Sequence, residues 1–214
     1  MPFNMDLTEA KLVLKTLALK GKQTLDRLTD SYNNFFEVKA EDARDIYLNT
    51  AKKLSQKGDY EKAIKTYRRL LEIEPSNLTA LVELGKIYIK VGLIVDAIEA
   101  LEKARSIDRT SDTICFYLGT AFFMDDKNTE ALMALKDAIK LNPAYTEAYY
   151  KIGLVYDNIG DHDLAIEAYK KVISLDPNFV KAYQSLGLAY ESKGQRDEAV
   201  KYFKKALEKE EKKI

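Results

Sequence analysis

The stretch YQSLGLAYESKGQRDEAVKYFKKAL, residues 183–207, repeats the pattern of an earlier one, YYKIGLVYDNIGDHDLAIEAYKKVI, residues 149–173. The two stretches are 34 residues apart, and Tyr, Gly, Ala and Lys recur in register. Continuing the same step toward the N-terminus gives five units without insertion, which begin at residues 44, 78, 112, 146 and 180. A fixed period of roughly 20 to 50 residues is the signature of a repeat architecture. The repetition therefore predicts the fold.

Within each unit, apolar residues recur at three- and four-residue steps, which predicts two amphipathic helices. Small residues stand at two positions where these helices would approach each other closely. Position 8 carries Ala51, Gly85, Gly119, Gly153 and Gly187, and position 20 carries Ala63, Ala97, Ala131, Ala165 and Ala199. Large residues at positions 4, 7, 11 and 24 would fill the space around that contact.

Two further positions predict where the helices end. Position 15 holds Gly58, Gly92, Gly160 and Gly194, and glycine ends a helix readily because it adopts a left-handed conformation at little cost. Position 32 holds Pro75, Pro143 and Pro177, and proline stops the second helix. The third unit has Asp126 in place of the glycine, and Asp tolerates that backbone less well. The second unit has Arg109 in place of the proline, so we expect a more helical join there.

A 34-residue helix–turn–helix with these positions resembles the tetratricopeptide repeat (TPR). The resemblance implies an all-α fold, a right-handed α-solenoid of five TPR units with a concave groove. The predicted units are residues 44–77, 78–111, 112–145, 146–179 and 180–214, the last including the end of the C-terminal helix. Residues 1–43 do not fit the register, but they still predict two helices, which we interpret as a degenerate N-terminal helical hairpin.

The composition excludes several other classes of protein. Lys+Arg and Asp+Glu are both 34, so the zero net charge disfavours a nucleic-acid binder that relies on a large basic field. One cysteine cannot form an internal disulfide, which fits a reducing compartment. No apolar run approaches the roughly 20 residues of a membrane helix. The N-terminus lacks the basic region and cleavage site of a secretory signal, so the expected compartment is the cytoplasm.

No residues predict an enzyme or a cofactor site. The sole histidine, His162, is flanked by Asp161 and Asp163 in an expected turn, and one histidine without a nearby cysteine makes a poor metal site. Cys115 stands at position 4, where the other units carry Tyr or Leu, and is expected to be a buried small hydrophobe. We therefore expect no catalytic residue, no metal and no cofactor.

In TPR arrays the first helix of each unit lines the concave face through positions 2, 5, 6, 9, 12 and 13. Carried over to this sequence, these positions predict a protein-binding groove with an apolar centre and flanking lysines. The groove residues are Val82, Glu83, Lys86, Lys90, Phe116, Tyr117, Phe123, Met124, Tyr150, Lys151, Lys181 and Gln184. An apolar and partly acidic helix or peptide would complement them. Chaperone adaptors bind a C-terminal carboxylate with a Lys/Asn/Asn/Lys/Arg clamp, which this chain lacks: it has Leu48, Lys52, Glu83, Thr113 and Tyr117.

The order of an N-terminal hairpin, AEDARDIYLNTAKKLSQKGDYEKAI, LGKIYIKVGLIVDAIEALEKA and the final two units resembles the MamA-like family of magnetosome-associated TPR proteins. The resemblance implies a non-enzymatic scaffold, peripheral on the cytoplasmic face of the magnetosome membrane. Such a protein self-assembles into a homo-oligomeric coat and recruits other magnetosome proteins. It also implies that the hairpin engages the groove of a neighbouring copy, through Leu25, Leu28, Tyr32, Phe35 and Phe36.

A second hypothesis stays open. The chain would be a monomeric adaptor that binds a peptide or helix of a foreign partner in its groove, with the N-terminal hairpin as a fixed cap. The sequence does not decide whether residues 1–43 dock on their own chain or on another.

Overall fold

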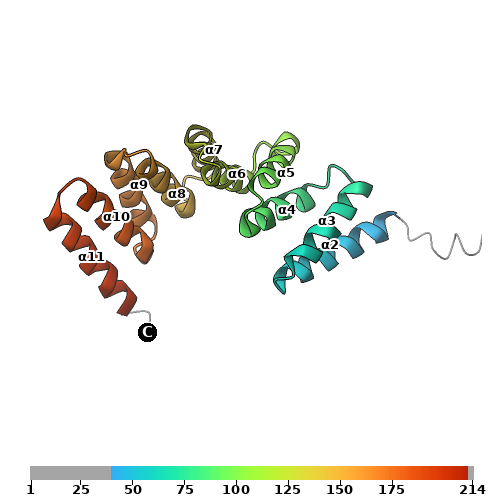
Figure 1. Ribbon diagram of the computed structural model, residues 1–214, viewed down its shortest axis with the longest axis horizontal. Coiled ribbons are helices and arrows are strands. Elements are labelled where there is room, and N and C mark those ends of the chain that lie inside the picture. Colours follow the sequence, from blue (N-terminus) through green and yellow to red (C-terminus); the bar gives the residue numbers. More distant parts are fainter. Residues whose placement is uncertain (1–39, 212–214) are drawn as a thin grey trace, which may run out of the picture.

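The computed structural model describes residues 40–211, which form ten α-helices and no strand within that range (Figure 1). Consecutive helices pair into five antiparallel hairpins, as the repeat predicts. The helices are α2 (Ala40–Gln56), α3 (Tyr60–Ile73), α4 (Leu78–Val91), α5 (Ile94–Ile107), α6 (Asp112–Met124), α7 (Asn128–Leu141), α8 (Thr146–Asn158), α9 (His162–Leu175), α10 (Val180–Ser192) and α11 (Arg196–Glu211).

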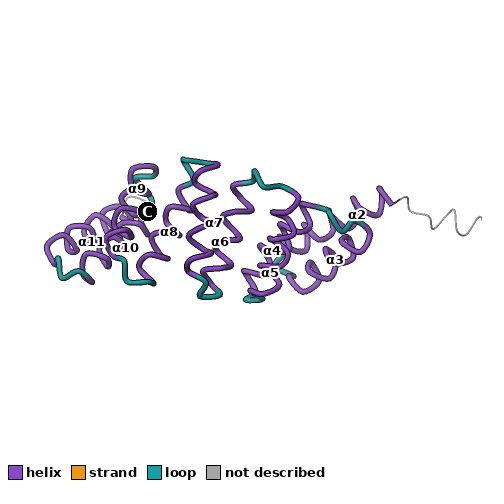
Figure 2. The backbone as a smooth tube through the Cα atoms, turned by 90° about the horizontal axis from the view of Figure 1, so that it is seen from above, coloured by secondary structure: helices purple, strands orange, loops and turns teal. Residues whose placement is uncertain are grey.

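The hairpins stack side by side into an arch (Figure 1). Helices α4, α6, α8 and α10 lie on the inner side of this arch, and α5, α7, α9 and α11 lie on the outer side. Seen from above, the helices follow one another as a single row along the long axis (Figure 2). The expectation of an all-α TPR solenoid is confirmed, and the inner side is the face that carries the predicted groove.

Close packing inside each hairpin depends on the small residue at position 8. A Cβ atom on Gly119 would lie 2.6 Å from Leu135 Cγ, and one on Gly187 would lie 2.5 Å from Phe203 Cε1. Both distances are shorter than van der Waals contact. Leu135 and Phe203 occupy position 24 of their units, so the small residue on the first helix faces the large one on the second. This contact sets how closely the two helices of a hairpin approach.

The turns inside the hairpins show why glycine stands at position 15. Gly58, Gly92, Gly160 and Gly194 have φ between 73° and 81°. Asp126 has a φ of 56° and is the non-glycine residue with positive φ in the described range. The expectation that Asp126 occupies a conformation better suited to glycine is therefore confirmed.

The join after the second unit does not continue as helix, and our expectation of a more helical join was wrong. Helix α5 ends at Ile107, and α6 begins at Asp112. The carboxylate of Asp108 accepts a hydrogen bond of 2.8 Å from the Thr110 N–H, which stabilises a turn in place of helix. Ser111 then caps α6 by accepting a bond of 3.3 Å from the Ile114 N–H. Asp108 and Ser111 therefore end one helix and begin the next without a proline.

The N-terminal hairpin residues Leu25, Leu28, Tyr32, Phe35 and Phe36 lie outside the described residues. Helix α2 begins at Ala40, slightly before the predicted start of the first unit.

Candidate functional site

The first helices of the units carry all twelve predicted groove residues, on α4, α6, α8 and α10. None of the twelve side chains is fully buried. Lys90, Met124, Lys181 and Gln184 are exposed, and the other eight are half-buried. Met124 is the exposed apolar member, with 47% of its surface accessible. The inner side of the arch thus presents apolar and charged groups together.

Aromatic rings at the centre of the groove are partly packed against one another and against side chains of adjacent segments. The centroid of the Phe116 ring lies 4.9 Å from that of Tyr145 and 5.2 Å from that of Tyr117, the latter edge to face. Lys86 Nζ lies 5.6 Å from the Tyr117 ring centroid and 2.7 Å from Glu83 Oε1. These contacts fix the orientation of the rings, so the centre of the groove is a preformed, half-covered apolar surface.

A hollow of about 350 Å³ lies on the inner side between α2 and α4. Leu48, Asn49, Lys52, Ser55, Gln56, Tyr67, Thr79, Glu83 and Lys86 line it. Burial raises the pKa of the Tyr67 hydroxyl to about 12. The sequence analysis did not assign the α2 residues to the groove. They occupy positions 5, 6, 9, 12 and 13 of the first unit. The same positions were used to predict groove residues in the other units, so applying them to the first unit would have found these residues.

The C-terminal part of the groove brings two lysines together. Burial lowers the pKa of Lys151, and the nearby charge of Lys181 lowers it further. The Tyr150 hydroxyl is 3.2 Å from Ser185 Oγ, and its ring centroid is 5.1 Å from that of Phe179. An anionic group bound beside Lys151 would offset both the burial and the repulsion, so this part of the groove favours a carboxylate.

A second hollow, of about 560 Å³, adjoins Lys181 and Gln184 near the C-terminal end. The Gln184 side chain donates a hydrogen bond of 3.0 Å to Glu210 Oε1, which links α10 to the last helix. Phe179, Val180 and the carboxylate of Asp176 also line this hollow. It extends the groove beyond the predicted residues.

His162 has a structural explanation. Its Nδ1 lies 3.1 Å from Asp157 Oδ1, and Asp157 Oδ2 accepts a hydrogen bond of 2.7 Å from the buried Tyr169 hydroxyl. Burial and this hydrogen bond raise the pKa of Tyr169. The described residues contain no group of three His, Cys, Asp or Glu side chains that could hold a metal. Asp157 therefore connects the two helices of the fourth hairpin through its two oxygens.

Helices long and apolar enough to cross a membrane do not occur within residues 40–211.

Comparisons with known proteins identify these units as tetratricopeptide repeats. The TPR repeat model matches residues 51–92 and 126–160, and the tetratricopeptide repeat model matches residues 146–179 and 180–213. One relative from Bos taurus, a BBSome complex member, is 30% identical over 86 residues. That match spans 16% of the relative's length, so it concerns a few repeats rather than the whole protein.

Solved structures give a closer match over most of the chain. A crystal structure of MamA protein is 54% identical, covers 81% of this chain and 94% of its own, and has a TM-score of 0.74. A second MamA crystal structure is 56% identical over 76% of this chain and 95% of its own, with a TM-score of 0.72. YrrB, described as a TPR protein with an unusual peptide-binding site, is 29% identical over 76% of this chain and 84% of its own, with a TM-score of 0.65.

These matches agree with the repeat register and with the arch of paired helices. TPR proteins bind protein partners, and this fold family consists of interaction scaffolds rather than enzymes. The identity to the MamA structures extends over nearly the whole of those chains. The chain therefore belongs to the MamA family of magnetosome-associated tetratricopeptide-repeat proteins.

Proposed function

We propose that this protein is a non-enzymatic scaffold that self-assembles into a homo-oligomeric coat on the cytoplasmic face of the magnetosome membrane. In this proposal the groove of one copy binds the N-terminal segment of another, and other surfaces recruit further magnetosome proteins. Those protein partners hold the coat to the membrane. The observation that carries the proposal is the inner face itself, where half-covered aromatic rings continue into the partly buried Lys151, beside the exposed Lys181.

The N-terminal sequence complements this face. Leu25, Leu28, Tyr32 and Phe35 recur at three- and four-residue steps, which predicts one apolar stripe on a helix. Two acidic residues, Asp26 and Asp30, lie between these residues in the sequence. An amphipathic helix of this kind suits recognition in an apolar groove, and its carboxylates suit lysines such as Lys151.

The geometry of such a contact explains a coat. A segment of one copy that binds the groove of the next uses two different surfaces, so the interface is heterologous. Heterologous contacts propagate when the rotation between copies does not close a ring. One pair of complementary surfaces on each chain is therefore enough to build a large assembly.

The test is light scattering after gel filtration of the full chain. The wild-type protein should form large assemblies. The double variant F35D/F36D should shift it to monomers or small oligomers, because two charges replace two of the apolar residues that are proposed to enter the groove. The matched control is N33D/N34D, which adds the same two charges to the same segment without removing apolar side chains. It should keep the large assemblies.

On the groove side, Lys151→Glu should also reduce assembly, and Lys204→Glu on the outer helix α11 should not. A wild-type chain that runs as a monomer at all concentrations would refute self-assembly. The same is true of large assemblies that persist in both F35D/F36D and K151E.

The second candidate is a monomeric adaptor for a foreign peptide. The observation that favours it is the likeness to YrrB, which is described as having a peptide-binding site. Under this hypothesis the full chain is monomeric, and F35D/F36D leaves its size unchanged. Light scattering therefore separates the two functions directly.

A further inference from the structure

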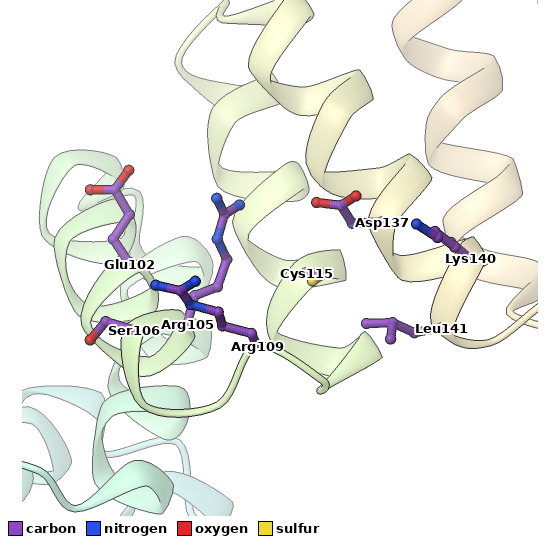
Figure 3. A pocket seen from close by; sticks show the side chains of 8 residues that line it. All are labelled: Glu102, Arg105, Ser106, Arg109, Cys115, Asp137, Lys140 and Leu141. Atoms are coloured by element: carbon purple, nitrogen blue, oxygen red, sulfur yellow. The ribbon is translucent and has the colours of Figure 1, made fainter.

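A further hollow in the described part of the chain lies away from the groove, on the outer side of the arch between α5 and α7. Its volume is about 590 Å³, within the range of ligand-binding cavities. Its lining residues are Glu102, Arg105, Ser106, Arg109, Cys115, Asp137, Lys140 and Leu141 (Figure 3). Arg105 and Arg109 lie on one side, Asp137 and Lys140 lie on the other, and Cys115 lies between them (Figure 3). We call this the outer hollow.

The outer hollow coincides with three departures from the repeat. Arg105 stands at position 28, where the other four units carry an aliphatic residue, namely Leu71, Ile139, Ile173 and Leu207. Cys115 stands at position 4, where the others carry Tyr47, Leu81, Tyr149 and Tyr183. Arg109 replaces the proline of position 32. All three residues line the same cavity.

The physical effect of these departures is visible at the preceding join. There Leu71 packs with Leu81 in one apolar cluster that fills the space between the units. At the outer hollow the pair is Arg105 and Cys115. Cys115 is too small to fill the space that Tyr or Leu fills elsewhere, and the Arg105 guanidinium favours water over an apolar contact. The hollow is therefore a consequence of sequence changes confined to one join.

The cations of the outer hollow have no ionic partner among residues 40–211. Arg105, Arg109 and Lys140 are exposed, and none of them lies within ion-pair distance of a carboxylate in that range. Two guanidinium groups on one side of a cavity offer several donors with the planar geometry that carboxylates accept.

Two acidic residues limit which anion fits. Glu102 and Asp137 also line the hollow, at positions where the other units carry Arg or Lys. Three cationic and two acidic side chains leave a net charge of +1. A single carboxylate neutralises that charge, whereas a doubly charged phosphate would exceed it and meet two carboxylates. The charge balance therefore favours a carboxylate.

We propose that the outer hollow binds one carboxylate, the side chain of a glutamate or aspartate on a docked protein segment. Arg105 and Arg109 hold it from the side of α5, and Lys140 holds it from α7. The site lies on the face opposite to the groove, so a chain whose groove is occupied can still use it. Binding at the outer hollow does not depend on self-assembly through the groove, so the outer hollow and the groove can be tested separately.

The test is fluorescence anisotropy of a labelled peptide of six glutamates titrated with the full chain. Saturable binding is expected, and it should weaken as salt rises. Arg105→Leu restores the residue class found in the other four units, so the fold should be retained, as thermal melting would show. It should weaken binding at least about tenfold, the effect of losing a charge-assisted hydrogen bond. Cys115→Tyr fills the hollow without changing any charge and should weaken binding similarly.

Two controls separate this site from general attraction to lysines. Lys204→Leu removes one positive charge from the outer helix α11, and Lys65→Leu removes one from helix α3. Both should leave the affinity of the peptide within about twofold. If R105L and K204L weaken binding equally, or if C115Y has no effect, the outer hollow is not the site and the proposal fails.

Competitors identify the ligand. If succinate displaces the peptide at concentrations that leave ionic strength unchanged, a small free dicarboxylate replaces the protein segment as the ligand. If inorganic phosphate competes better than succinate, the assignment to a carboxylate is overturned. Displacement only by unlabelled acidic peptide supports a protein-borne glutamate or aspartate.

Discussion

The join between the second and third units and the join between the fourth and fifth are built on the same repeat, yet their outer sides differ. At the later join Ile173 packs into the apolar cluster, and Tyr183 is only 6% exposed. The Tyr183 hydroxyl donates a hydrogen bond of 3.1 Å to the Pro177 carbonyl. At the earlier join Arg105 and Cys115 stand at the matching positions, and a cavity opens.

On the inner side it is the later join that carries the unusual pair of residues. The later join places Lys151 beside Lys181, and their charges repel each other. The earlier join has Glu83 and Thr113 at the same two positions, and Glu83 pairs with Lys86. Each join therefore has one irregular face, and the irregular faces point in opposite directions. The comparison indicates that the hairpin interior is fixed, whereas the surfaces between units are free to diverge.

The largest effect should come from the interior of the hairpins, which is built in the same way on both sides of the comparison. Gly119→Ala and Gly187→Ala each place a Cβ too close to a large side chain of the second helix. We expect each to lower the free energy of unfolding by about 2–4 kcal/mol, because the helices must separate or the facing side chain must leave its rotamer. Urea denaturation measures this loss. Gly194→Ala is the control, with a φ of 73° but no neighbouring atom within 4 Å of its Cβ, and should cost only about 1–2 kcal/mol.

Exchanging one residue between the joins tests the difference itself. Ile173→Arg brings the residue of the earlier join into the later one, where Ile173 is packed against the apolar cluster. We expect a loss of about 2 kcal/mol in the free energy of unfolding, since an apolar contact is removed and a charge is desolvated. The reverse change, Arg105→Leu, should be neutral or stabilising by up to about 1 kcal/mol. Equal losses for both variants in chemical denaturation would show that the joins do not differ as described.

The third unit contains a smaller irregularity, in its turn. Asp126→Gly should raise the free energy of unfolding by about 1 kcal/mol, because glycine adopts the left-handed backbone without steric cost. Gly160→Asp imposes the same conformation on aspartate in the next unit and should destabilise by a similar amount. Thermal denaturation measures the change in stability of each variant. Changes of the same sign in the two variants would contradict this explanation.

The smallest effect concerns the lysine pair of the later join. The pKa of Lys151 in the folded chain lies below its ordinary value of 10.5. Below the folded pKa the lysine is charged in both states, and burial and Lys181 penalise it only in the folded one. The stability lost through this penalty is regained as pH rises from the pKa of Lys151 in the folded chain toward 10.5, its ordinary value.

Lys151→Met should therefore be slightly more stable than the wild type at pH 7, and its advantage should shrink as pH rises toward 10.5. Urea midpoints at several pH values measure the difference. Lys90→Met, at an exposed lysine of the same inner face, is the control for removing one positive charge from that face. An advantage for K151M that stays constant across the range would contradict the lowered pKa.

The sequence predicted that the groove residues lie on the first helices, because they recur at fixed positions there, and their role in binding stays a prediction. It missed the hollow beside α2, since the rule was not applied to the first unit. It could not say how far each ring is covered: Lys86 of the second unit lies over the Tyr117 ring of the third, and such contacts arise between units rather than within one. It also misjudged Arg109, because the side chains of Asp108 and Ser111 decide where the helices end.

The sequence by itself determined the repeat, the pairing of helices and the left-handed turn at Asp126, because these depend on local backbone preferences and on one contact inside each hairpin. Only the tertiary structure decided that Arg105, Arg109 and Cys115 share a cavity and that Lys151 and Lys181 lie close enough to repel. The reason is that both features depend on how one hairpin stacks on the next. That stacking brings together side chains from different units, and their distances are set by the packing of whole helices.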